Sequence, residues 1–352
     1  MPAPPFGYGT WRPFGTYDFM WSAMQPTQGS YTGANTNPDR ANMVFDWSFA
    51  DTVVADAVTN GIKIMWPVWG TPIWACRGAD QIGGVVTQGP WTTNGFSPVG
   101  EGAVPEKTQY IKDFITAFLG RYNTGAAVIN RIEQRNEPFP TSSGWTGTMT
   151  QLVTEGAAIY QATKAADSRV KVLSPPFYSA SAFATWLTTE DPVTGLLGWQ
   201  TCDEIAVHNY GGVPNKAMGG SDLWSCDSMG PGTAYALMDA AGVSRMPHCA
   251  TEWGLRENLQ DAIAVFAGTT AAYRKTYISR ILAMSALNGS QVMCIFGYNA
   301  LAGDYVSDTT GVMAAVGDVH TKLAGQTITA GGYLADGSVT VTIASGPTTY
   351  VF

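Results

Sequence analysis

The stretch RIEQRNEPFP, residues 131–140, places an Asn-Glu-Pro triplet directly behind a segment that is typical of a β-strand, VINRIEQRN (128–136). Pro138 cannot donate to a strand ladder, so the strand ends before it. A helical pattern precedes this strand, PEKTQYIKDFITAFLGRYN (105–123), and another follows it at 150–166. A strand between two helices, with polar residues at its end, is the repeating unit of a parallel α/β fold.

The same unit recurs along the chain. FDWSFADTVVADAVTNG (45–61) has apolar residues at helical spacing and stops at Asn60–Gly61, and IKIMWPVWG (62–70) follows as a buried strand. Pro105 is expected at the first helical position of the 105–123 segment. Further strands are expected at VKVLS (170–174), DEIAVHN (203–209), PHCATEWG (247–254) and QVMCIFGYN (291–299), preceded by helices at 150–166, 180–187, 233–241 and 271–289.

Repeated helix-then-strand order implies parallel strands joined by right-handed crossovers. The fold class is therefore α/β, and with 352 residues a closed (β/α)8 TIM barrel is favoured over a doubly wound sheet, because no Gly-rich phosphate loop follows the first strand. Clear strands end near residues 18, 69, 136, 174, 208, 252 and 297. That is seven strands instead of eight, so the first strand is either compressed into PPFGYGTW (4–11) or missing.

The end of the chain changes character. Val, Thr and Ile alternate between Gly-rich turns from residue 324 onward, which predicts two or three antiparallel strands. The expected domains are a barrel at 1–323 and a small β extension at 324–352.

Composition restricts the partners. A net charge of −8 argues against nucleic acid and anionic membranes, and no apolar run is long enough for membrane insertion. No signal peptide is visible; an extracellular or particle-associated location is favoured. The five cysteines show no metal-ligand spacing, so neither a metal nor a cofactor is expected. Cys202 and Cys226 flank a Gly-rich loop and either form a disulfide or remain free thiols.

Reactive residues of such a barrel gather at the carboxyl ends of its strands. The candidates there are Asp18, Glu137, His208, Tyr210 and Glu252, with Trp66, Trp69, Trp253, Tyr178 and Tyr298 nearby in sequence. Double-displacement hydrolysis of an acetal needs two carboxyl groups about 5–5.5 Å apart. Glu137 and Glu252 end two different strands and meet that requirement if they face each other.

Several of these residues have structural alternatives. Glu133 has the same strand parity as Glu137 and is interpreted as a buried partner of Arg131 or Arg135. Asp18 is either a subsite residue or a turn former, and His208 either an active-site or a structural histidine. Four tryptophans are either sugar platforms or core residues: Trp69, Trp74, Trp145 and Trp253.

Five motifs in order resemble one clan of enzymes. RNEPF (135–139) resembles the Asn-Glu-Pro signature of the fourth strand of clan A glycoside hydrolases, and ATEWG (250–254) resembles their seventh-strand nucleophile segment. The sixth-strand His-x-Tyr pattern appears as VHNY (207–210). Two early segments also match, DFMWSAMQPTQGSY (18–31) and WGTPIWA (69–75). The set is most similar to glycoside hydrolase family 39 and its bacterial polysaccharide-hydrolase relatives, over roughly residues 9–300.

The resemblance implies roles for individual residues. Glu137 would be the general acid/base and Glu252 the nucleophile of a retaining glycosidase. Asn136 would donate to the sugar 2-hydroxyl, and His208 and Tyr210 would position the sugar and the nucleophile. Either Tyr210 or a nearby arginine would keep Glu252 ionised by donating a hydrogen bond to it, and Arg12 is the candidate, because it matches an early-strand arginine of the family. Arg135 departs from the family, which often has an aromatic residue there. The full expected substrate-binding set is Asn136, His208, Tyr210, Trp253, Trp69, Asp18, Tyr178, Tyr298 and Arg12.

The substrate is expected to be a carbohydrate polymer or oligosaccharide. Long loops with aromatic residues at 76–104, 139–149 and 211–232 favour an extended groove and endo action. Two alternatives stay open: a non-catalytic glycan-binding barrel in a larger assembly, such as a phage tail-associated protein, and a transglycosylase that uses the same two glutamates.

Overall fold

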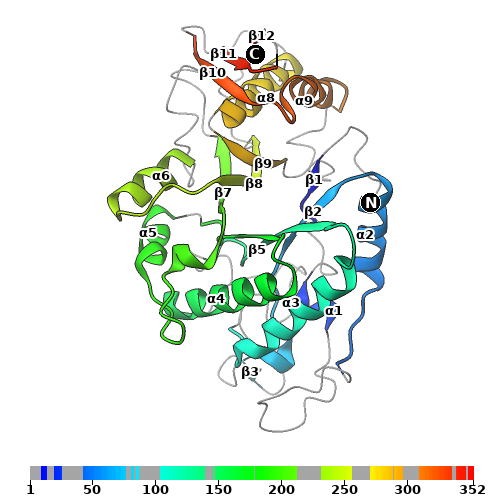
Figure 1. Ribbon diagram of the computed structural model, residues 1–352, viewed down its shortest axis with the longest axis vertical. Helices are drawn as coiled ribbons and strands as arrows, with labels where there is room; N and C mark the ends of the chain where they lie inside the picture. The colour runs from blue at the N-terminus through cyan, green and yellow to red at the C-terminus, as the bar shows by residue number, and fades with distance from the viewer. Residues whose placement is uncertain are drawn as a thin grey trace. The chain divides into compact units, whose positions relative to one another are not determined.

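The computed structural model (Figure 1) describes most of the chain in segments separated by gaps. These residues form two compact units, which meet in sequence between Ala206 and Val207. The described segments are 9–13, 20–25, 43–76, 81–82, 85–86, 104–138, 145, 147–177, 179–211, 231–255, 270–287, 289–295, 309–334, 338–345 and 348–352.

The first unit, up to Ala206, is built on a parallel sheet. Its strands follow one another in chain order: β1 (Thr10–Trp11), β2 (Lys63–Pro67), β5 (Ile129–Glu133) and β6 (Lys171–Leu173). A parallel bridge from Leu173 to Glu204 continues this order. A doubly wound sheet has a point where strand order reverses, and these strands show none. They are therefore wound in one direction, as in a barrel.

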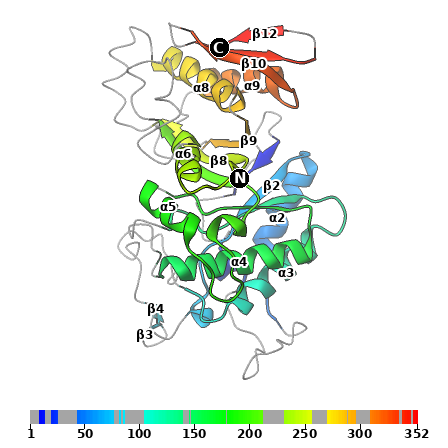
Figure 2. The same ribbon diagram turned by 60° about the vertical axis from the view of Figure 1, so that its left-hand side comes forward.

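The helices of the first unit lie between these strands in sequence. They are α1 (Trp21–Met24), α2 (Ser48–Thr59), α3 (Thr108–Tyr122), α4 (Met149–Ala166) and α5 (Ala180–Thr188), with 3-10 turns at Ile73–Ala75 and Gly198–Thr201 and a β3–β4 hairpin at Gln81–Ile82 and Val85–Val86. Helices α3 and α4 pack side by side (Figures 1 and 2). The predicted helices are confirmed, whereas α1 and the hairpin were not predicted.

Local sequence sets the ends of these helices. Helix α2 ends in a Schellman motif, in which Gly61 N donates to Val58 O and Ile62 N donates to Ala57 O. Gly61 takes the left-handed φ of 65° that the motif needs. The predicted stop signal is therefore confirmed. Helix α4 begins with a capping box between Thr148 and Gln151.

The start of α3 differs from the prediction. Pro105 is not its first residue, because α3 begins at Thr108 with Lys107 as its N-cap. Pro105 instead forms an antiparallel bridge with Cys76, and Glu106 N donates to Ala75 O. These tertiary hydrogen bonds hold the segment extended, which overrides the preference of proline for a helix start.

Aromatic residues fill the core of the first unit. Trp66 on β2 is 1% exposed and contacts Phe118 on α3 at a centroid distance of 4.6 Å. Phe114 stacks near Phe118 at 5.8 Å and contacts Trp21 at 5.7 Å. Burial of rings of this size supplies a large part of the hydrophobic free energy of a core. Much of the aromatic content therefore packs helices on the sheet.

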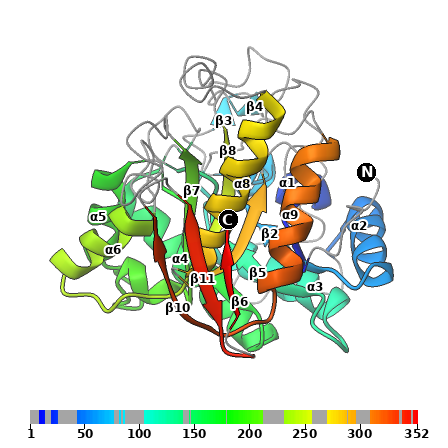
Figure 3. The same cartoon turned by 90° about the horizontal axis from the view of Figure 1, so that it is seen from above.

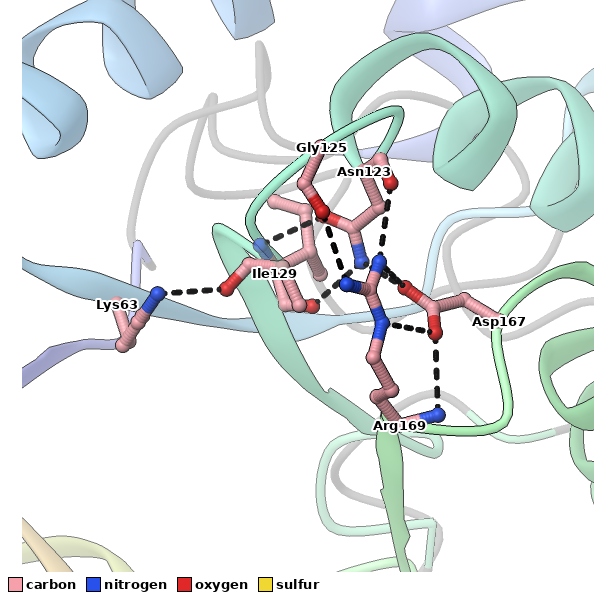
Figure 4. A network of polar contacts seen from close by, with 7 residues as sticks. Lys63, Asn123, Gly125, Ile129, Asp167 and Arg169 are labelled. Carbon is pink, nitrogen blue, oxygen red and sulfur yellow. Dashed lines mark hydrogen bonds and ion pairs between the residues drawn. The ribbon is translucent and has the colours of Figure 1, made fainter.

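The beginning of β5 is tied to the neighbouring loops (Figure 4). The Asn123 side chain accepts from Ile129 N at 3.0 Å and donates to Ile129 O at 2.8 Å. Arg169 donates to Gly125 O at 2.8 Å and forms an ion pair with Asp167 at 2.8 Å. Both ends of the loop before β5 are thus anchored. This determines where β5 begins, the strand that leads to Asn136 and Glu137.

The second unit, from Val207 onward, contains a parallel pair of strands, three described helices and a C-terminal antiparallel sheet. Strand β7 (Ile205–Gly211) continues into it and neighbours β8 (His248–Leu255), which pairs in parallel with β9 (Ser290–Ile295). Helices α8 (Thr270–Leu287) and α9 (Thr309–Leu323) lie side by side (Figure 3), and α8 contacts β9. The remaining elements are α6 (Pro231–Ala240) and the antiparallel sheet β10 (Ile328–Tyr333), β11 (Val339–Ile343) and β12 (Thr348–Val351).

The C-terminal sheet packs on α8 (Figure 2). Val339, Val341 and Ile343 of β11 point to the buried face, whereas Thr340 and Thr342 alternate with them. This is the period-two pattern of a strand covered on one face. The predicted antiparallel tail is confirmed, and α9 before it was not predicted.

The strand count agrees in part. Strands β2, β5 and β6 fall within the predicted segments, β7, β8 and β9 overlap them and extend beyond them by one or two residues, and β1 lies at the end of PPFGYGTW. The predicted strand end near residue 18 lies outside the described residues. The described strands form separate sheets and do not show a closed barrel.

Two further expectations can be compared with the structure. Cys202 is a free, buried thiol, so the free-thiol alternative holds for this residue, and Cys226 lies outside the described residues. Burial raises the pKa of the Cys202 thiol above its ordinary value, and nearby Asp203 and Glu204 raise it further. Among the described helices, none is both long and apolar enough to cross a membrane.

Candidate active site

Asn136 and Glu137 follow the carboxyl end of β5 and are accessible. The chain is buried from Ile132 to Arg135 and again at Pro138, and these two residues between them are partly exposed. A buried strand thus ends in an amide and a carboxylate that a ligand can reach. This is the position where parallel α/β folds place reactive groups.

Glu137 has a strained backbone. Its φ is 39°, and it is the one non-glycine residue with a positive φ among the described residues. An L-residue in the left-handed region pays a steric cost of about 1–2 kcal/mol. Such strain persists where the surroundings hold it, and it is concentrated at functional sites.

Arg12 and Glu133 form a buried ion pair beside Asn136. Arg12 Nε lies 3.1 Å and 3.2 Å from the two oxygens of Glu133, and Nη2 lies 2.5 Å from Oε1. Their side chains are 2% and 0% exposed. Arg12 Nη2 also donates to Asn136 Oδ1 at 2.9 Å. The arginine therefore connects the strand end to the accessible amide.

The expected partner of Glu133 was wrong. The prediction paired it with Arg131 or Arg135, but both lie elsewhere: Arg131 binds Glu204 at 2.8 Å, and Arg135 binds Glu155 at 2.8 Å. Strand parity does not separate Arg131 from Glu133, because residues two apart share a face. Arg131 is paired instead with Glu204, and Arg135 lies beyond the end of β5. The partner of Glu133 comes from 121 residues earlier in the chain.

Arg135 anchors the other side of the segment. Besides Glu155 on α4, it donates to Thr71 Oγ1 at 2.5 Å and lies over the Trp145 ring at 5.0 Å. Glu155 is 1% exposed. Sequence reasoning missed Glu155, although a carboxylate on the face shared by Leu152 and Ile159 signals a buried cationic partner.

Glu252 and His208 lie on neighbouring strands of the second unit. Glu252 belongs to β8 and His208 to β7, and His208 Nδ1 lies 3.6 Å from Glu252 Oε2. Their side chains are 6% and 0% exposed. This distance is too long for a hydrogen bond and short enough for electrostatic attraction to a protonated imidazole. The structure thus brings together two predicted site residues.

The tryptophan alternatives are partly decided. Trp145 is 3% exposed and covered by Arg135, so it is a core residue. Trp74 Nε1 donates to Gln25 O at 2.9 Å, and its ring contacts Trp21 and Tyr110. That ring packs against the aromatic core but is partly exposed, so Trp74 retains both interpretations. Trp69 is partly exposed and retains both interpretations.

The remaining candidates are not tested by the structure. Asp18, Tyr178 and Tyr298 lie outside the described residues. Tyr210 and Trp253 lie on β7 and β8, but their side chains are outside the described set. Their roles stay predictions.

Comparison with known proteins identifies the fold. A family 39 glycoside hydrolase from Bacteroides cellulosilyticus WH2 matches with a TM-score of 0.53 and 12% identity, over 97% of this chain and 63% of that one. The chain is similar in fold to clan A glycoside hydrolases. The catalytic domain of the family 30 xylanase C from Talaromyces cellulolyticus matches with a TM-score of 0.50 and 13% identity, over 94% and 68% of the two chains. A glucosidase from Croceicoccus marinus has the same TM-score and identity, over 87% and 62%.

The clan A resemblance predicted from the motifs is thereby confirmed at the level of the fold. The chain spans 47–63% of the length of the β-xylosidase, glucosidase and family 39 structures that it matches. No protein-family profile and no curated protein sequence matches the chain.

Proposed function

We propose that the protein is a retaining glycoside hydrolase that cleaves a polysaccharide or oligosaccharide, with Glu137 as general acid/base and Glu252 as nucleophile. The observation that carries the proposal is the strained and accessible Glu137, which follows Asn136 at the end of a parallel strand in a clan A fold. Strain at a solvent-accessible carboxylate costs stability and contributes no packing, so a functional demand accounts for it best.

The proposed chemistry proceeds in two displacements. Glu252 attacks the anomeric carbon while Glu137 gives its proton to the departing glycosidic oxygen, which leaves a glycosyl ester on Glu252. Glu137 then takes a proton from water as the water attacks the same carbon and releases Glu252. Each carboxylate returns to its initial state, and the product keeps the anomeric configuration of the substrate.

This mechanism requires the two carboxyl groups to stand about 5–5.5 Å apart. We therefore also propose a closed (β/α)8 barrel, with β1 as its short first strand. The sequential parallel order from β1 to β6 supports this arrangement. His208, 3.6 Å from Glu252, would orient the nucleophile and the sugar.

The test compares the wild type with Glu137→Gln and Glu252→Gln on a panel of β-glycans and bacterial exopolysaccharides. Xylans and glucans come first, because the matching structures include xylanases and a glucosidase. Both variants are expected to lose at least ~100-fold in kcat/KM, since each removes a group required in the transition state. Glu204→Gln is the control, because Glu204 is a carboxylate that directly precedes β7, at the opposite end of a strand from Glu137, and it is paired with Arg131.

The outcomes separate the rival functions. NMR from the first turnover shows the anomeric configuration of the product. A retained configuration supports double displacement, and an inverted one excludes it. A protein that binds a glycan without cutting it is the non-catalytic barrel. Transfer of the glycosyl unit to an added sugar acceptor, in preference to water, identifies a transglycosylase.

Endo action is part of the proposal. Internal cleavage lowers polymer viscosity early, while few reducing ends appear. An exo-acting enzyme shows the reverse, so a viscometer and a reducing-end assay on one sample distinguish the two modes.

A further inference from the structure

We propose that Arg12 and Glu133 are positioning residues that fix the orientation of the Asn136 amide, so that its NH2 group faces the sugar 2-hydroxyl. This inference rests on the proposed function. The role is distinct from the direct contact with Glu252 or substrate that the sequence assigned to Arg12.

First, Glu133 holds the Arg12 guanidinium in one orientation. Arg12 follows β1 and Glu133 ends β5, and the sheet order puts β2 between these two strands. The guanidinium spans the position of β2 and donates hydrogen bonds to both carboxylate oxygens of Glu133. A forked donor on a bidentate acceptor has little freedom to rotate. Glu133 therefore sets where Nη2 points.

The second step is the amide. Arg12 Nη2 donates to Asn136 Oδ1 at 2.9 Å. Arginine has donors and no acceptor, so the amide oxygen must face it and the NH2 group must face away. In a flipped amide, the Asn136 NH2 group would face the Arg12 guanidinium, and two groups that both donate cannot form a hydrogen bond. The orientation of Asn136 is thus dictated by the charge pair behind it.

The third step is exposure. Arg12 and Glu133 are buried, whereas Asn136 is partly accessible. The pair therefore acts on a ligand through Asn136. Hydrogen bonds to the sugar 2-hydroxyl strengthen in the transition state of glycoside cleavage, so a misdirected amide lowers kcat more than it raises KM.

The experiment uses two substrates that differ only at that hydroxyl: the 2,4-dinitrophenyl glycoside of the sugar identified by the glycan panel, and its 2-deoxy form. This leaving group departs without protonation, which removes Glu137 from the first step. The measured quantity is the ratio of kcat/KM for the 2-hydroxy substrate to that for the 2-deoxy substrate. Asn136→Ala defines the ratio without the amide.

We expect Arg12→Lys and Glu133→Gln each to lower this ratio about 10-fold, toward the value for Asn136→Ala, because displacement of a positioned group by a fraction of an ångström has effects of this order. Lysine keeps the charge but cannot hold Glu133 and Asn136 with one planar fork. Glu155→Gln is the matched control. It breaks an ion pair that is equally buried and joins Arg135, the residue next to Asn136, and should leave the ratio unchanged.

A variant that leaves one buried charge unpaired risks unfolding. Arg12→Met combined with Glu133→Met removes both charges together and keeps the volume, and it too should lower the ratio. An unchanged ratio in folded Arg12→Lys and in the double variant, alongside a lowered ratio in Asn136→Ala, overturns the positioning role and leaves the proposed function intact. An unchanged ratio in Asn136→Ala overturns the 2-hydroxyl contact itself.

Discussion

Glu137 combines a strained backbone, which costs stability, with an accessible carboxylate. A glycine at this position would adopt φ 39° without the clash between Cβ and the backbone. The chain instead keeps a carboxylate there. The buried ion pair Arg12–Glu133 lies close by and is joined to the preceding residue, Asn136.

The strain itself can be measured by two substitutions. Glu137→Ala and Glu137→Gly both remove the carboxylate, but only glycine relieves the steric clash. We expect the glycine variant to be the more stable of the two by about 1 kcal/mol, in urea unfolding at neutral pH. An alanine variant of equal or greater stability would show that the residue is not strained in solution.

At the scale of elements, the hydrogen bonds of the loop between α3 and β5 determine where β5 begins. Asp167 accepts from Arg169 N and from the Asn123 side chain, in addition to its ion pair with Arg169. These hydrogen bonds, with that from the Arg169 side chain the largest, lower the pKa of Asp167 to about 2. The ionised carboxylate is therefore part of the folded structure.

This pKa shift predicts a pH dependence. Since the folded pKa lies below the unfolded value of about 3.9, the stabilisation is complete above pH ~4 and is lost as the pH falls toward 2. Asp167→Asn should destabilise the protein at pH 6, because it removes the charge that pairs with Arg169. The loss should be only roughly 1 kcal/mol, because the exposed side chain of Arg169 is screened by water. The same variant should have a much smaller effect near pH 2. Urea unfolding at both pH values checks this, and an equal loss at both would contradict it.

At the scale of the whole molecule, the second unit includes the C-terminal sheet. Gly331 on β10 has no room for a side chain, because a Cβ there would lie 2.5 Å from the Leu287 side chain of α8 and 2.4 Å from Thr340 O. Thr340 belongs to β11, the strand that pairs with β10. Ser338 accepts from Arg280 of α8 at 3.1 Å. Residues 324–352, proposed as an extension of the barrel, thus share packing with a helix of the same unit.

A core substitution in that sheet tests the shared packing. Val341 is 0% exposed, and Val341→Ala should cost about 2 kcal/mol. Val351 is 59% exposed on the same sheet, so Val351→Ala should change stability by less than ~0.5 kcal/mol. Hydrogen exchange followed by mass spectrometry should show faster exchange in α8 for Val341→Ala. Unchanged exchange in α8 would mean that the extension folds by itself.

The sequence alone did not predict α1, α9 or the β3–β4 hairpin, but it determined the alternation of helices and strands, the antiparallel tail and the clan A resemblance. These depend on local rules: apolar spacing, helix stops such as Asn60–Gly61, and short motifs whose residues are neighbours in the chain. It also indicated Asn136 and Glu137, because a strand end followed by proline is a local signal.

The tertiary structure decided the partners. Glu133 binds Arg12 across 121 positions, and Arg135 binds Glu155 on α4. No periodicity encodes which of several arginines a buried carboxylate meets, since that depends on how strands and helices stack in space. The same reason applies to Pro105, which lies in an extended bridge to Cys76.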